Sequence, residues 1–178
     1  MIIGGVFTGS KAEIDWIDSG LFKSFYPDVW QAYLDRTPEQ YRDNPSAYHF
    51  DKAFNGTAKE CKASSYAYEC LEAGVIKLDD RFTAENFDDY DPSKIQIEMH
   101  YLANLCFMPD RHILNNAHTL KMPIWIVQGR YDMVCPPTTA YELHQKAPNS
   151  RMYWTIAGHA TEHESENVFR AIFAGIVE

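Results

Sequence analysis

Two residues that could act together in catalysis follow two apolar segments in the last third of the chain. Asp132 stands in "GRYDMVCPP", directly after "MPIWIVQ", and His159 stands in "AGHA", directly after "RMYWTI". In a nucleophilic triad, a carboxylate fixes the tautomer of a histidine and stabilises its protonated form, while the histidine takes the proton of the nucleophile. Asp132 and His159 are therefore candidates for the acid and the base of such a triad.

Each of these residues also has a plain structural interpretation. An Asp after Gly-Arg-Tyr can begin a turn or cap a helix that starts at Pro137, and a His after Gly can be an ordinary loop residue. Their joint placement favours catalysis, because reactive groups in parallel α/β sheets collect in the loops at the carboxyl ends of strands. The acid precedes the histidine, which is also their order in α/β-hydrolases.

The segments around these residues predict a parallel sheet. "PIWIVQ" and "RMYWTIA" read as strands, whereas "PTTAYELHQKAP" and "ESENVFRAIFAGIV" read as helices, the second with Val168, Ile172 and Ile176 on one face. The order β-α-β-α is typical of a parallel sheet covered by helices. Both strands are nearly all apolar, so we expect them to be buried on both faces.

Residues 10–118 read instead as helices and loops. "SKAE", "TAKE" and "SKIQ", which begin at Ser10, Thr57 and Ser93, are capping boxes in which two side chains satisfy the free donors of a helix start. The predicted helices run from these boxes to near Gly20, Leu71 and Cys106, with further short helices at 27–35 and 46–54. Ahead of them, "MIIGGVF" reads as a short strand. We therefore expect core segments at 1–9 and 119–178, and a helical block at 10–118 between them.

Composition excludes several classes of protein. The chain has 178 residues, of which 46% are apolar and 14% aromatic, enough for one sizeable core. A net charge of −9 without a Lys/Arg cluster argues against a nucleic-acid partner, and no apolar run approaches the roughly 20 residues that cross a membrane. The first residues lack the features of a signal peptide, so we expect a cytoplasmic protein. The four cysteines have no C-x-x-C spacing, so we expect free thiols and no metal or other cofactor.

Several segments, in order along the chain, resemble one family. "GVFTGSKAEIDW", "YECLEAG", "QIEMHYLANLCF", "GRYDMVCPP" and "AGH" resemble the carboxyl-terminal part of the prolyl aminopeptidases, or proline iminopeptidases, which are serine peptidases of the α/β-hydrolase superfamily. The family usually has Trp-Glu-Gly where this chain has Tyr68-Glu69-Cys70. The resemblance implies a partial α/β-hydrolase fold, with a helical cap inserted between one strand and a carboxyl-terminal parallel β-α-β-α unit.

The resemblance also implies roles for individual residues. Asp132 and His159 match the acid and base of the triad, and Glu69 and Glu98 match two cap carboxylates that hold the free amino terminus of the substrate. Phe7, Trp16 and Cys135 match positions that line the proline pocket. The implied partner is a peptide with a free amino-terminal proline. Ile17 and Leu102 stand where the family tends to have aromatic residues, which puts a strict preference for proline in question.

The residues themselves leave alternatives open. On its predicted helix Glu98 has Ile95, Tyr101 and Leu102 as neighbours, so its carboxylate projects from an apolar face and needs a cation or a donor. A peptide ammonium would serve, and so would a Lys or Arg of the body or exposure at the rim. Glu69 lies on a mixed face. Without the family, core packing is the simpler interpretation of Phe7, Trp16 and Cys135.

A nucleophile is missing from this set. None of the nine serines stands in the Gly-x-Ser-x-Gly elbow of the α/β-hydrolases, and no HGGPG-like loop is present to supply oxyanion donors. In the family both lie upstream of the segment that "MIIGGVF" resembles. We therefore expect about the second half of a hydrolase, inactive alone, whose first strand leaves an open edge that an amino-terminal half would complete.

Three functions remain open at this point. The chain is expected to be the carboxyl-terminal portion of a serine aminopeptidase that releases amino-terminal proline. The alternatives are another capped α/β-hydrolase, such as an esterase or epoxide hydrolase, and a catalytically inactive fragment that binds peptide amino termini or has no activity left. Glu69 and Glu98 discriminate between the first two, because an ester or epoxide carries no ammonium for carboxylates to bind.

Overall fold

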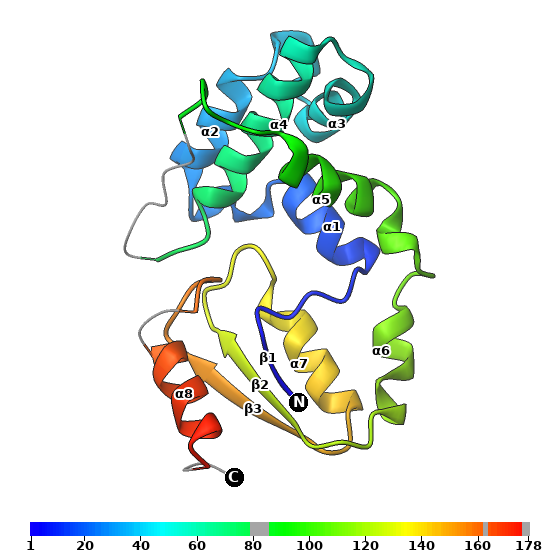
Figure 1. Cartoon of the computed structure of the whole chain (residues 1–178), viewed down its shortest axis with the longest axis vertical. Coiled ribbons are helices and arrows are strands. Elements are labelled where there is room, and N and C mark those ends of the chain that lie inside the picture. The colour runs from blue at the N-terminus through cyan, green and yellow to red at the C-terminus, as the bar shows by residue number, and fades with distance from the viewer. Residues whose placement is uncertain (79–85, 162–163, 176–178) are drawn as a thin grey trace.

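The structure, a computed structural model, describes residues 1–78, 86–161 and 164–175, and it has two parts that lie one above the other (Figure 1). A small sheet with helices on both faces forms the lower part, and a block of helices forms the upper part. The chain leaves the sheet after its first strand, passes through the helical block, and returns to the sheet at Ile124. The helical block is thus an insertion between two neighbouring strands.

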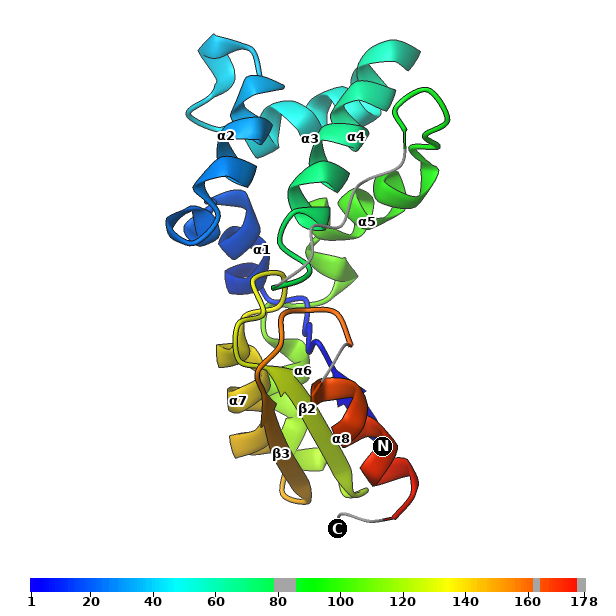
Figure 2. The ribbon, with the colours of Figure 1, turned by 90° about the vertical axis from the view of Figure 1, so that its left-hand side faces the viewer.

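Three parallel strands make up the sheet. β1 (Ile2–Gly4), β2 (Ile124–Gly129) and β3 (Ser150–Thr155) lie in the order β1-β2-β3. α7 (Pro137–Lys146) connects β2 to β3, α8 (Glu164–Phe173) follows β3, and the two helices cover opposite faces of the sheet (Figures 1 and 2). The predicted β-α-β-α order is confirmed. Ile176, which the sequence places on the apolar face of the last helix, lies outside the described residues.

The two longer strands differ in burial. β2 is the central strand, and all of its residues except Trp125 are buried. In β3 only Thr155 is buried, so the prediction that this strand is buried on both faces is wrong. The physical reason is its position at the edge of the sheet, where one side has no neighbouring strand among the described residues.

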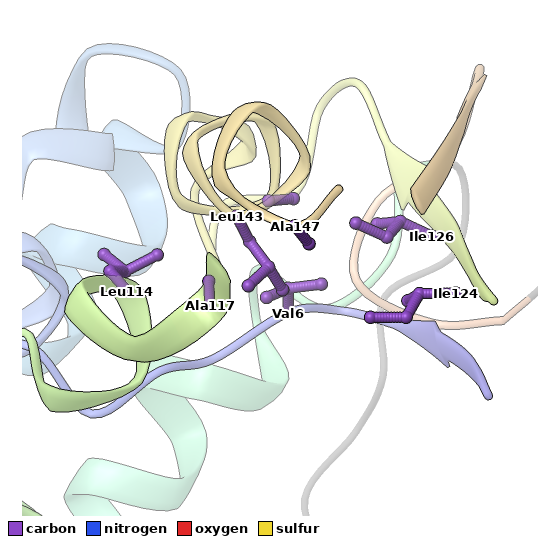
Figure 3. Packing of buried hydrophobic residues seen from close by; sticks show 8 residues of the cluster. Val6, Leu114, Ala117, Ile124, Ile126, Leu143 and Ala147 are labelled. Carbon is purple, nitrogen blue, oxygen red and sulfur yellow. The ribbon is translucent and has the colours of Figure 1, made fainter. Parts of the chain in front are cut away.

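The core of the lower part lies between β2, α7 and the short helix α6 (His112–Asn116) (Figure 3). It is made of small and branched apolar side chains from four separate segments, namely Val6, Leu114, Ala117, Ile124, Ile126, Ala140, Leu143 and Ala147. Val6 follows β1 directly. Packing of this cluster therefore fixes the segment that leads from the sheet into the helical block.

The upper part contains the helices α1 (Lys11–Asp18), α2 (Pro27–Asp35), α3 (Pro45–Asn55), α4 (Ala58–Ala73) and α5 (Ser93–Ala103). Short 3₁₀ turns occur there at Leu21–Ser24, Glu39–Tyr41 and Leu105–Phe107, and a further one, Ala117–Thr119, follows α6 in the lower part. Two apolar clusters hold these helices together, one around Phe22, Tyr33 and Leu71 and one around Tyr68, Ile95 and Met99. We call residues 10–107 the cap, because α6, which belongs to the predicted helical block of residues 10–118, packs with the sheet instead.

Two of the three predicted capping boxes are confirmed. Glu13 accepts hydrogen bonds from the backbone and the hydroxyl of Ser10, and Glu60 does the same for Thr57. The third is wrong, since α5 begins at Ser93 itself, and Gln96 donates instead to the carbonyl of Ala53.

The end of α5 also differs from the prediction. The helix ends at Ala103 rather than near Cys106, because Leu105, Cys106 and Phe107 all have positive φ and cannot continue a right-handed helix. Among the described residues, no helix combines the length and the apolar character needed to cross a membrane.

Candidate active site

Asp132 and His159 lie next to each other at the carboxyl edge of the sheet. Asp132 follows β2 and His159 follows β3, and because these strands are parallel neighbours, both loops meet at the same edge. Nδ1 of His159 lies 3.1 Å from Oδ2 and 3.2 Å from Oδ1 of Asp132. The predicted hydrogen bond between the two side chains is therefore present.

The carboxylate of Asp132 is held by several donors. It is 1% exposed, and it accepts hydrogen bonds from the backbone N–H groups of Val134 (3.0 Å) and Cys135 (2.8 Å) and from Nε2 of Gln128 (3.0 Å). A buried carboxylate needs such partners, because burying a charge without them is costly. The loop after β2 is thus folded around this one side chain.

His159 is held from two sides. Its backbone N–H and that of Ala160 donate to the carbonyl of Ile76, just beyond the end of α4, which ties the loop to the cap. On the other side lies Gly5, where a Cβ atom would come within 3.0 Å of Cε1 of the imidazole. Gly5 also has a φ of +55°, which favours glycine.

Asp132 changes the protonation of the imidazole. The hydrogen bond to Asp132 raises the pKa of His159 above its usual value of 6.5, although burial opposes this shift. With Nδ1–H directed at Asp132, the neutral ring leaves Nε2 as its acceptor nitrogen. The arrangement therefore suits a base that accepts a proton at Nε2.

A pocket of about 340 Å³ opens beside His159, between the carboxyl edge of the sheet and the cap. Apolar side chains form most of its wall, and two carboxylates are the acidic groups in it. Its lining residues are Gly5, Phe7, Ile17, Glu72, Glu98, Tyr101, Leu102, Cys106, Val134, Cys135 and His159. Of the residues predicted to bind substrate, Phe7, Cys135 and Glu98 line this pocket.

The two carboxylates of the pocket belong to Glu72 on α4 and Glu98 on α5. The side chains are in hydrogen-bonding contact with each other. Burial raises the pKa of Glu72 well above its usual value of 4.5, and the negative charge of Glu98 raises it further. The structure thus places a carboxyl group that resists ionisation beside a second acidic side chain in this pocket.

Glu69 and Trp16 do not line this pocket. Glu69 lies 4.0 Å from the ammonium of Lys94, and Nε1 of Trp16 donates to the carbonyl of Met133 at 2.7 Å while its ring packs in a cap cluster. The structure therefore brings Glu72, and not the predicted Glu69, together with Glu98. Glu72 lies one helical turn further along α4, on nearly the same face.

The cysteines of the pocket do not replace the missing nucleophile. All four cysteines are free, and burial raises the pKa of the thiols of Cys106 and Cys135. A thiol with a raised pKa stays protonated at neutral pH and is a weak nucleophile. The described residues contain no cluster of His, Cys, Asp and Glu side chains that could hold a metal ion.

Comparison with known proteins points to one group of hydrolases. The chain is 32% identical over 169 residues to a proline iminopeptidase of Arabidopsis thaliana, a match that covers 90% of this chain and 44% of that protein. It is 30% identical over 169 residues to a probable proline iminopeptidase of Leptolyngbya boryana (90% and 52%), and 29% identical over 174 residues to a proline iminopeptidase of Xanthomonas citri (94% and 55%). The chain spans about half the length of these curated relatives.

Two other comparisons add less. No family model matches the chain. Among solved structures, MGS-M2, an α/β-hydrolase enzyme from a Medee basin deep-sea metagenome library, aligns with 98% of this chain and 54% of its own, at a TM-score of 0.47 and 15% identity.

Proposed function

Because this chain belongs to the proline iminopeptidase family of α/β-hydrolases and matches about half the length of its curated relatives, we propose that it supplies part of a serine aminopeptidase. In this proposal, Asp132 and His159 are the acid and the base, and the cap binds the amino terminus of the peptide. The enzyme releases an amino-terminal proline. The nucleophile is a serine that lies outside these 178 residues.

The observation that carries the proposal is the content of one pocket. His159 and the carboxylate pair of Glu72 and Glu98 line the same 340 Å³ space. A base and a pair of carboxylates in one pocket suit a peptide whose first residue occupies that pocket. Its ammonium group would bind between the two carboxylates, and its first carbonyl would lie near His159.

The chemical steps follow from the Asp132–His159 pair. Nε2 of His159 accepts the hydroxyl proton of the serine as the oxygen attacks the carbonyl, and Asp132 stabilises the imidazolium that forms. The imidazolium then gives its proton to the leaving amine, and the peptide bond breaks with an acyl-enzyme left behind. In the second half of the cycle, His159 activates water in the same way, and proline is released.

The walls of the pocket suit a compact first residue. Phe7, Ile17, Leu102, Val134 and Cys135 present apolar surface, which matches a hydrocarbon ring. A prolyl amino terminus is a secondary ammonium with two N–H donors, so each of the two carboxylates can receive one charge-assisted hydrogen bond. Trp16 packs against the same buried cluster as two residues of this wall, Ile17 and Val134.

The partner in this proposal is the amino-terminal half of the hydrolase domain. Among the described residues β1 pairs only with β2, so its other edge is open. Beside that edge lies a groove of about 350 Å³ with an apolar lining from Ile3, Val6, Phe7, Leu120 and Leu143. An added parallel strand would satisfy the backbone groups of β1 and cover this groove, and it would bring a serine elbow to the carboxyl edge of the sheet.

The carboxylate pair also argues against an esterase or epoxide hydrolase. Neither an ester nor an epoxide offers a cation, so the contact between the half-buried Glu72 and Glu98 would find no partner in such a substrate. An inactive peptide-binding fragment would keep the same pair but would show no turnover after the sheet is completed.

The proposal is tested by reconstitution. An amino-terminal segment that carries the Gly-x-Ser-x-Gly elbow, taken from one of the curated relatives, is fused ahead of residue 1 or supplied as a separate chain. Proline p-nitroanilide, alanine p-nitroanilide and p-nitrophenyl acetate are compared as substrates. We expect release from the proline anilide above all, and equal rates on the acetate ester would support the esterase alternative instead.

A further inference from the structure

A single buried amide connects three parts of the site. In β2, Gln128 follows four apolar residues, Ile124 to Val127, and its side chain is 0% exposed. An amide in such a position is costly unless its donors and acceptor all find partners.

The partners of Gln128 come from both sides of the pocket. Nε2 donates to Oδ2 of Asp132 at 3.0 Å and to the carbonyl of Cys135 at 3.2 Å. Oε1 accepts from the backbone N–H of Val6 at 3.1 Å. Turning the amide over would place NH₂ against another donor, and oxygen against two acceptors, so these partners permit one orientation only.

Each of these partners belongs to the site described above. Asp132 bonds His159, Cys135 lines the pocket, and Val6 stands between Gly5, which contacts the imidazole, and Phe7, which lines the pocket. Val6 and Gln128 are 122 residues apart in the chain, yet the Gln128 side chain joins the segment after β1 to the loop after β2.

We propose that Gln128 is a positioning residue, which holds the carboxylate of Asp132 against Nδ1 of His159 and fixes the Gly5–Phe7 segment beneath the imidazole. Oδ1 of Asp132 accepts hydrogen bonds from two backbone N–H groups. Apart from His159, the donor to Oδ2 is the amide of Gln128. Without it the carboxylate can turn about its last bond, and the backbone N–H of Val6 loses its acceptor. Gln128 touches no substrate and acts only through its neighbours.

The catalytic part of this inference rests on the proposed function, but its geometric part does not. Gln128→Met removes both ends of the amide and keeps an unbranched side chain of similar length. Gln128→Glu keeps the length and an acceptor for Val6, but its ionised form cannot donate to Asp132. Thr155→Val is the control, because it removes a buried hydroxyl on the neighbouring strand that contacts Ser165 and, at 3.4 Å, the backbone carbonyl of Gln128, while it leaves the hydrogen bonds of the Gln128 amide in place.

The decisive measurement is NMR of His159 in the 178-residue chain, with its signals assigned through His159→Ala. We expect a slowly exchanging Nδ1–H resonance in the wild type and in Thr155→Val. In Gln128→Met this resonance is lost and the pKa of His159 falls back towards 6.5. If Gln128→Met does not fold, Gln128→Glu is used, and its resonance is expected to weaken as the pH rises and the new carboxyl ionises. A folded variant that keeps the resonance and the pKa of the wild type, at every pH, overturns the proposal.

A second measurement separates this inference from the proposed function. In the reconstituted enzyme, Gln128→Met is expected to lower kcat on the order of 10²-fold with KM little changed, because a displaced base affects the chemical step more than binding. If reconstitution yields no activity at all, the proposed function fails while the NMR result still decides the role of Gln128. If activity appears and Gln128→Met lowers kcat no more than Thr155→Val does, the positioning role fails while the function stands.

Discussion

The carboxyl groups of Glu72 and Glu98 contact each other across the gap between α4 and α5, inside the pocket that His159 lines. Two acidic groups in contact oppose folding once both lose their protons, so a structure keeps such a pair chiefly where a cation binds. In the proposed function this pair binds the amino terminus of the substrate, and the next two predictions depend on the contact.

Glu72→Gln is expected to stabilise the free chain at neutral and alkaline pH. The folded-state pKa of Glu72 lies above its unfolded value of 4.5, so the folded state binds this proton more tightly, and its stability falls as the pH rises from 4.5 through the folded-state pKa. The amide has no proton to lose. Melting temperatures at pH 4 and pH 8 test this. Each kcal/mol by which the substitution raises the free energy of unfolding should raise the melting temperature by about 2–4 °C. Glu69→Gln is the control, and an equal melting temperature for Glu72→Gln and wild type at pH 8 would contradict the pairing.

In the reconstituted enzyme, Glu72→Gln and Glu98→Gln should each weaken binding of proline substrates. Losing one charge-assisted hydrogen bond of about 1.5–3 kcal/mol raises KM roughly 10–150-fold. Glu69→Gln should change KM by less than about threefold, because Glu69 lies outside the pocket. Steady-state kinetics on proline p-nitroanilide decide between the two assignments: a larger effect of Glu69→Gln would return the amine-binding role to that residue.

Asp132→Asn should lower the pKa of His159. The hydrogen bond to the carboxylate is the main cause of the raised value, and burial alone pushes the pKa below 6.5. The pair therefore stabilises the fold below about pH 6.5, and this contribution disappears as the pH rises through the raised pKa. NMR titration of His159 in both proteins measures the shift. An Asp132→Asn protein whose His159 titrates as in the wild type would show that the carboxylate does not control this imidazole.

Gly5→Ala should disturb the imidazole directly. A methyl group there lies 3.0 Å from Cε1 of His159, and the positive φ adds a backbone cost of about 1–2 kcal/mol. Gly175→Ala is the matched control, because Gly175 also has a positive φ but no atom lies within 4 Å of the added Cβ. Thermal unfolding and the NMR signals of His159 are compared. Both variants should lose stability, but the His159 signals should move in Gly5→Ala alone.

Much of this architecture follows from the sequence, for identifiable reasons. β2 and α7 are strongly patterned, and turns at "GRYD" and "AGH" place Asp132 and His159 after parallel strands, so their contact could be predicted. The hydrogen bonding of Gln128 could also have been predicted, since a lone polar residue in an apolar strand requires partners.

Other features could not be predicted from one sequence. Glu69 and Glu72 are three residues apart on α4, and hence only about 60° apart around the helix, so the pattern could not tell which of them faces α5. The early end of α5 depends on positive φ at Leu105, Cys106 and Phe107, and none of these residue types favours that conformation. The exposure of β3 depends on its place at the sheet edge, which is a property of the whole fold.

The most direct test of the central claim compares Asp132→Asn and His159→Ala in the reconstituted enzyme with the isolated 178-residue chain. We expect no release of proline from proline p-nitroanilide by the isolated chain. After the amino-terminal segment is added, turnover should appear, and Asp132→Asn should lower kcat on the order of 10⁴-fold because the imidazole loses its favoured tautomer. Turnover that survives His159→Ala, or a reconstituted enzyme whose kcat is unchanged by Asp132→Asn, would contradict the roles proposed for these two residues.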